Sequence, residues 1–204
     1  MESSEKKGFR YWFTNVFWYH YGKISLVALF LLVTAVWFTI DALKKETYDL
    51  NVAVILNRPV ARDDLGALYT LLGDAAGDVN GDGKTRVNIV TVNLADEENR
   101  EGSRYQMMLY LSLPEYTIFL MDERESGLYA HQDDETFQVL GDYGIATEDE
   151  TGRRVALGRR AVLAPLGEEV YACLADWTVS DKGDPAMTAA AVRALQALLA
   201  SPAA

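Results

Sequence analysis

The sequence predicts an α/β protein: a single N-terminal transmembrane helix followed by a three-layer α/β domain with a mostly parallel sheet and a C-terminal hairpin plus helix. Two observations carry this prediction. Residues 24–40 form an uncharged apolar run near the start of the chain. After it, strand-like segments alternate with long helix-like segments, the order that gives parallel strands joined by crossover helices. We therefore expect a cytoplasmic aromatic and basic tail over residues 1–23, a transmembrane signal anchor over 24–43 and an extracytoplasmic α/β domain over 44–204.

The apolar run is long enough to cross a bilayer as a helix. Its length corresponds to about 25 Å of helix, near the short end for a membrane span. A buried core helix is one alternative, but no second apolar segment of this length exists to cover it. A cleaved signal peptide is the other alternative, but bulky residues and no small-residue cleavage site follow the run. Aromatic residues typical of the headgroup level flank it: Trp12, Phe13, Phe17, Trp18, Tyr19, Tyr21, Trp37 and Phe38.

The charge distribution separates the two ends of the chain. Residues 1–45 hold six Lys or Arg against three acids, which leaves 13 basic and 27 acidic residues in 46–204. Basic residues nearly balance across the run, so the expected orientation rests on the span coming first. We expect a single-pass protein of the cell membrane with a cytoplasmic N-terminus. The expected partners are the lipid bilayer and a membrane or cell-envelope protein; the acidic domain repels phosphate backbones, so no nucleic acid is expected.

Periodicity and end signals predict the elements of the domain. Residues 48–56 are apolar on both faces, as in a strand within a covered sheet. Asp184 is a suitable N-cap and Pro185 a suitable first helical residue before a strong helix-forming run. The predicted order is strand 48–56, helix 61–75, strand 86–94, helix 97–113, strand 116–122, a short helix around 133–140, strands 155–164 and 168–177 joined by a tight turn at Pro165-Leu166-Gly167, and the terminal helix.

A thioredoxin-like fold is the alternative, because it has a similar order of elements. Thioredoxin chemistry needs a thiol of low pKa, usually in a C-x-x-C motif. The only thiol is Cys173, in a predicted strand, where a small buried hydrophobic residue is the expected role. The sequence therefore predicts no redox site, and no catalytic residue is assigned.

One motif has the residue types of a metal site. Asp78, Asn80 and Asp82 stand at positions 1, 3 and 5 of a calcium loop of EF-hand type, and the backbone carbonyl of Lys84 stands at position 7. A hard cation such as Ca²⁺ requires clustered oxygens of this kind. Position 12, where a bidentate acid belongs, is Ile89, so a further carboxylate such as Asp74 or Asp96 is needed to complete the shell. An ordinary turn between a helix and a strand is the competing interpretation.

Several short motifs resemble those of one group of proteins. These are WYHY at residues 18–21, the single span, LNVAVIL at 50–56, DVNGDGK at 78–84 and IFLMDE at 118–123. Together they resemble uncharacterised single-pass membrane proteins of clostridia-type Firmicutes, whose outer domain is similar to one lobe of an extracellular solute-binding protein. The resemblance implies an extracytoplasmic α/β domain and supplies no assigned activity.

Three functions follow as hypotheses. The leading one is a non-enzymatic, membrane-anchored extracytoplasmic binding or accessory module, similar to a single solute-binding lobe. A calcium-stabilised structural domain is the second. An envelope hydrolase is the third, and it requires two carboxylates in a cleft with separated pKa values.

Overall fold

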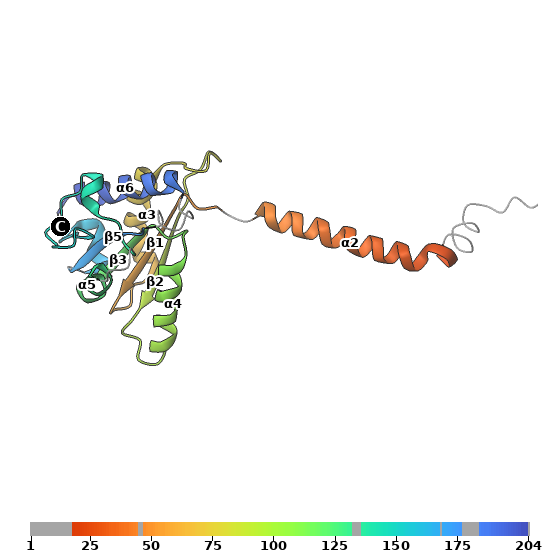
Figure 1. The fold of residues 1–204 in the computed structure, drawn as a ribbon, viewed down its shortest axis with the longest axis horizontal. Helices are drawn as coiled ribbons and strands as arrows, with labels where there is room; N and C mark the ends of the chain where they lie inside the picture. The colour runs from red at the N-terminus through yellow and green to blue at the C-terminus, as the bar shows by residue number, and fades with distance from the viewer. Residues whose placement is uncertain (1–17, 45–46, 132–135, 168, 177–183, 204) are drawn as a thin grey trace, which may run out of the picture. The chain divides into compact units, whose positions relative to one another are not determined.

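The computed structural model describes residues 18–44, 47–131, 136–167, 169–176 and 184–203. The chain divides into two compact units, Met1–Glu46 and Thr47–Ala204. The first unit contributes one described helix, and the second is an α/β domain (Figure 1).

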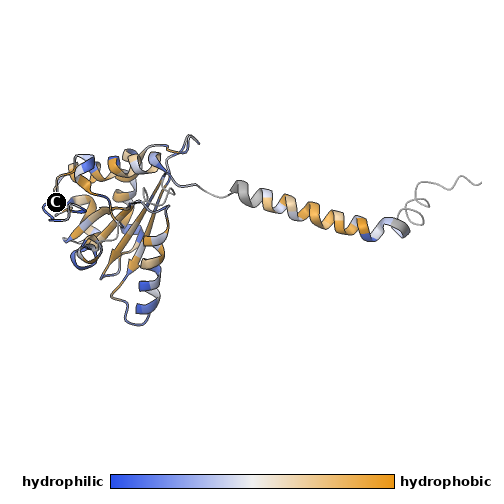
Figure 2. Ribbon diagram, viewed as in Figure 1, coloured by the Kyte–Doolittle hydropathy of each residue, from blue (hydrophilic) through white to orange (hydrophobic). Residues whose placement is uncertain are grey.

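Helix α2, Trp18–Lys44, contains the predicted span. It is the one helix of the described chain that is long and apolar enough to cross a membrane, over Tyr21–Thr39. That stretch is about 28 Å long at 1.5 Å per residue, close to the thickness of a hydrocarbon core. Two polar side chains within it are internally satisfied, because Thr34 and Thr39 each donate a hydrogen bond of 2.8 Å to the carbonyl four residues earlier. Its large apolar side chains are exposed along this length, and most of the middle of the helix is coloured as hydrophobic in Figure 2.

The domain is built on a mixed five-stranded sheet of order β2-β1-β3-β5-β4 (Figure 1). Strand β1 pairs in parallel with β2 and β3, whereas β5 runs antiparallel to both β3 and β4. The sheet is therefore less parallel than the sequence predicts. The strands are β1 Leu50–Leu56, β2 Val87–Asn93, β3 Ile118–Asp122, β4 Arg154–Ala156 and β5 Val170–Leu174.

Helices cover both faces of the sheet. Alternate residues of β1, such as Val52 and Val54, pack in one apolar cluster with side chains of α3, Gly66–Ala76, and α6, Pro185–Ala200. The intervening Ala53 and Ile55 pack in a second cluster on the opposite face. That cluster includes Met107 of α4, Arg100–Ser112. Helix α5, Glu123–Ala130, follows β3 directly. Short 3₁₀ helices complete the domain: η2 Arg62–Leu65, η3 Leu140–Tyr143 and η4 Ala161–Leu166.

The C-terminal helix begins as the sequence predicts. The Asp184 carboxylate accepts a hydrogen bond of 2.8 Å from the Ala186 amide, and Pro185 occupies the first turn. This cap satisfies one of the amides that have no partner within a helix. Buried Leu195 and Leu198 then hold α6 in the core next to α3.

Two predicted elements are wrong in detail. Strands β4 and β5 do pair antiparallel, but only the first two residues of the predicted strand 155–164 belong to β4, and its second half forms η4. Pro165 lies inside η4, where Leu163 and Leu166 are buried, so the connection is a packed segment rather than a tight turn. The predicted short helix over 133–140 lies partly outside the described residues. Within the rest, Phe137 forms an isolated bridge to Ala175 instead of a helical turn.

Candidate functional site

The predicted calcium loop connects α3 to β2, near the amino end of the sheet. Gly81 and Gly83 have φ values of 76° and 78°, a conformation that favours glycine, so the turn depends on both. Asp78, Asn80 and Asp82 all belong to this exposed loop, as the sequence predicts.

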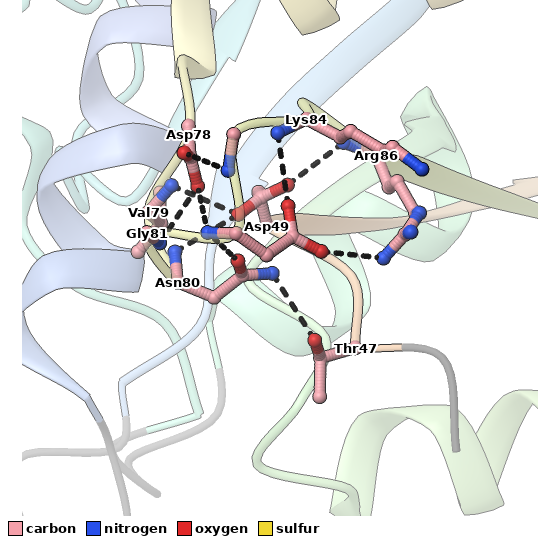
Figure 3. A network of polar contacts seen from close by, with 10 residues as sticks. Thr47, Asp49, Asp78, Val79, Asn80, Gly81, Lys84 and Arg86 are labelled. Atoms are coloured by element: carbon pink, nitrogen blue, oxygen red, sulfur yellow. Dashed lines mark hydrogen bonds and ion pairs between the residues drawn. The ribbon is translucent and has the colours of Figure 1, made fainter. Parts of the chain in front are cut away.

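The side chains of the loop bond to its own backbone (Figure 3). Asp78 accepts hydrogen bonds from the Gly81 amide at 2.7 Å and the Gly83 amide at 2.7 Å. Asn80 Oδ1 accepts from the Asp82 amide at 2.9 Å. Asp82 accepts from the Lys84 amide at 2.9 Å, the bond of a turn closed by a side chain.

A residue that the sequence analysis did not single out, Asp49, anchors this loop. Its side chain is buried and accepts hydrogen bonds from the amides of Arg86 at 2.7 Å, Val79 at 2.8 Å and Asn80 at 3.1 Å. Burial alone raises the pKa of Asp49, but these amides and the nearby Arg86 outweigh it and hold the pKa below its ordinary value. The sequence feature that could have identified Asp49 is its place directly before the apolar segment that forms β1, a strand that is wholly buried. Figure 3 shows Asp49 between the two ends of the loop.

Three features of the structure bear on the calcium prediction. Within the described residues, no group of three or more His, Cys, Asp or Glu side chains is gathered. Asp82 Oδ2 instead contacts Arg86 Nη1 at 2.8 Å, so a cation here competes with a guanidinium. Asp96, a suggested additional ligand, follows the carboxyl end of β2, whereas the loop precedes its amino end. Seven strand residues, about 23 Å, separate these two ends.

The opposite edge of the sheet brings together residues that the sequence analysis missed. Asn57 and Arg58 follow the carboxyl end of β1, and Asp122 ends β3. Asp122 accepts hydrogen bonds from the amide and side-chain nitrogens of Asn57, and its Oδ1 lies 3.1 Å from Arg58 Nη2. Strands β2 and β3 lie on opposite sides of β1 in the sheet. The chain therefore goes from β1 to one neighbour and then crosses back to the other. Ligands of open α/β sheets bind outside the carboxyl ends of the strands at such a reversal.

Two pockets flank this reversal. One, of about 520 Å³, is lined by two arginines, three acidic residues and a glycine: Arg58, Arg124, Asp122, Glu123, Glu169 and Gly167. Gly167 has a φ of 89°, and a Cβ atom there would collide with the Arg58 guanidinium. The absence of a side chain at Gly167 therefore makes room for Arg58 beside Asp122.

The second pocket, of about 450 Å³, lies between α4 and α5 and contains a concentration of positive charge. Its polar lining comprises Arg100, Arg104 and Arg124 together with Asn57 and Glu125. We call it the arginine pocket. Both helices begin at the carboxyl edge of the sheet, so the positive ends of their dipoles lie on this side.

The acidic residues that a hydrolase would use lie in a separate pocket. Glu148, Asp149 and Glu150 line a pocket with Arg154, but Asp149 Oδ1 lies 2.8 Å from Arg154 Nε. Burial raises the pKa of Asp149, yet the Thr151 hydroxyl and Arg154 outweigh it and lower the pKa overall, the reverse of what a general acid needs.

Cys173 is wholly buried, and burial raises the pKa of its thiol far above the ordinary value. A thiol that resists ionisation is a poor nucleophile, so its position suits a core residue rather than a redox site.

Comparisons with known proteins identify no relative. No family model matches the chain, and neither the curated proteins nor the solved structures contain a significant match.

Proposed function

We propose that this protein is a membrane-anchored extracytoplasmic binding module, with α2 as an uncleaved signal anchor and the arginine pocket as its ligand site. The single observation that carries the proposal is α2, because its stretch Tyr21–Thr39 is long and apolar enough to cross a membrane and its large apolar side chains are exposed. Its uncharged apolar run, residues 24–40, is 17 residues long and exceeds the 7–15 residues of a signal-peptide core. The resemblance to a single solute-binding lobe supports the same role, with a membrane or envelope protein as partner.

The domain also supports binding more than catalysis. The arginine pocket combines three guanidinium groups with apolar side chains and has one carboxylate, Glu125, a composition suited to recognition. The hydrolase alternative has the weaker support, because the half-buried carboxylate Asp149 is already neutralised by Arg154.

Membrane fractionation of cells that produce the full chain tests the anchor. We expect the chain to stay in the membrane pellet after a carbonate wash, at its full intact mass. External protease should degrade the domain in intact cells. Leu31→Lys should release the chain, because a lysine at a span centre costs about 3 kcal/mol, whereas Leu31→Ala should not. A soluble full-length chain, a product lacking residues 1–43 or a protected domain contradicts the proposal.

Calcium stabilisation is the second candidate function. It is supported by the placement of Asp78, Asn80 and Asp82 in one exposed loop, with their oxygens drawn toward its interior by amide hydrogen bonds. Millimolar calcium outside a cell can occupy even a weak site. Comparison of melting temperatures with calcium and with a chelator tests this candidate.

A further inference from the structure

Arg100 and Arg104 of the arginine pocket are cations without ion-pair partners in the described part of the chain. They lie one turn apart on α4, where two like charges repel and destabilise a helix. Acids outnumber basic residues about two to one in 46–204, so neutralising partners are abundant in the domain. Two unpaired arginines beside a pocket therefore suggest that their partner is a ligand.

Arg124 supplies a third guanidinium from α5. Its side chain is 81% exposed, and its single ion-pair contact among the described residues is a long one, 4.0 Å to Glu125 Oε1. The pocket lining thus holds three cations against one carboxylate, in a domain of opposite overall charge. Guanidinium groups recognise carboxylate and phosphate through paired hydrogen bonds.

The rest of the pocket is apolar. Leu94, Met107, Met108 and Leu128 line it, and the Tyr129 hydroxyl donates to the Met108 sulfur at 3.6 Å. Met108 and Leu128 are 58% and 53% exposed, values exceeded in the described domain only by Tyr105 among the large exposed hydrophobic side chains. Exposed apolar surface concentrated at a pocket is typical of a binding site.

Size and charge limit the ligand class. A volume of about 450 Å³ suits a small molecule. The 27 acids of residues 46–204 repel nucleic acids and anionic membrane surfaces, whose charges extend well beyond the pocket. A small anion avoids most of this repulsion, because salt screens charges beyond about 8 Å.

We propose that the arginine pocket binds a small organic anion, a carboxylate or phosphate that carries an apolar group, with Arg100, Arg104 and Arg124 holding the anion and Met108 and Leu128 contacting the apolar part. This inference deepens the proposed binding function and rests on it for its biological setting. The binding chemistry is measurable on the purified protein wherever the cell places it.

Calorimetric titration of the full chain in phosphatidylcholine nanodiscs tests the proposal. The probes are phenyl phosphate, phenylacetate, inorganic phosphate and the uncharged phenylacetamide. We expect at least one aromatic anion to bind, inorganic phosphate to bind at least tenfold more weakly, and phenylacetamide to give no measurable heat.

Matched variants locate the binding. Arg100→Gln and Arg104→Gln should each weaken aromatic-anion binding about tenfold, because a hydrogen bond to a charged group contributes on this scale. Arg62→Gln removes the same charge from an exposed residue outside both flanking pockets and should leave affinity within twofold. Leu128→Ser should weaken phenyl phosphate but not inorganic phosphate, whereas Leu109→Ser, outside the pocket, should change neither.

Absence of binding by both aromatic anions at millimolar concentration overturns the proposal. So does an equal effect of Arg62→Gln and Arg104→Gln. If inorganic phosphate binds as tightly as phenyl phosphate, the apolar half of the proposal is wrong. If any of these results is obtained with a chain that still fractionates with membranes, only the ligand proposal fails and the anchor proposal is unaffected. If the chain is soluble but binds phenyl phosphate, only the anchor proposal fails.

Discussion

The two ends of β1 hold charged residues in opposite circumstances. At the amino end, the Asp49 carboxylate is buried and accepts three backbone amide hydrogen bonds. Beyond the carboxyl end, Arg100, Arg104 and Arg124 line a pocket with little or no neutralisation among the described residues. A charged group that is hydrogen-bonded within the domain stabilises the fold. A charged group without such partners is available to bind a ligand. Substitutions at the first end should therefore change stability, and substitutions at the second should change binding.

The largest effect is expected from Asp49→Ala. It leaves the amides of Val79, Asn80 and Arg86 without their acceptor beside the buried position of Asp49 and should lower the free energy of unfolding by about 3 kcal/mol. Near-UV circular dichroism of the full chain during urea unfolding measures the loss. Asp63→Ala, at an exposed carboxylate, should cost under about 0.5 kcal/mol. Equal losses in the two variants would refute the structural role of Asp49.

A smaller loss is expected from Gly167→Ala, which tests whether the carboxyl edge also depends on backbone geometry. Gly167 has φ 89° and ψ −169°, a region that essentially only glycine adopts, so the alanine should cost on the order of 1–3 kcal/mol. It should also displace Arg58 from Asp122, because the new Cβ collides with the guanidinium.

Gly141→Ala is the matched control for Gly167→Ala, since no atom lies within 4 Å of its added Cβ. Urea unfolding of both variants measures the difference. A Gly167→Ala chain as stable as the control would refute the backbone strain expected at Gly167.

Lowering the pH should gradually remove the contribution of Asp49 to the free energy of unfolding. The pKa of Asp49 and that of Asp149 are lowered in the folded state, so their stabilisation is present above the unfolded pKa of about 4 and is lost as pH falls through the folded pKa. Unfolding between pH 6 and pH 2 should show this decline. Asp49→Asn should decline less steeply than the parent chain; an identical slope would exclude Asp49 as a source.

Calcium should have the smallest effect. A site with a dissociation constant near 1 mM adds about 0.6 kcal/mol at 2 mM calcium. The melting temperature should then fall slightly when a chelator replaces calcium, and Asp78→Asn should abolish the difference. An unchanged midpoint in the parent chain would leave the loop as a turn held by its own hydrogen bonds.

The sequence predicts the elements whose signals are local. The buried strand β1, the capped helix α6 and the apolar helix α2 each follow from periodicity or from end residues, and the structure contains all three. The failure of the predicted strand 155–164 has a local cause. Its apolar residues fit either a strand or a turn of helix, and burial of Leu163 and Leu166 favoured η4.

The site depends on contacts between distant residues, which no local pattern reveals. Asp122 meets Asn57 across 65 positions, and the arginine pocket joins residues of two helices. Arg100, Arg104 and Arg124 are ordinary surface residues by sequence, and only the strand order places them at one edge. The 78–84 loop could be singled out from the sequence because its pattern of oxygen-bearing residues is contiguous, whereas Asp49, which holds the loop, was missed because it lies about 30 residues away.

The central position of β1 also has a consequence for biogenesis. Leu50 pairs with Val87, and Val52 pairs with Ile118. The first strand of the domain is therefore synthesised well before either of the strands that pair with it. During that interval an uncharged, aggregation-prone stretch is exposed a few residues after α2. Production of this protein should therefore depend on chaperones that shield nascent chains, and slower translation should lower its yield.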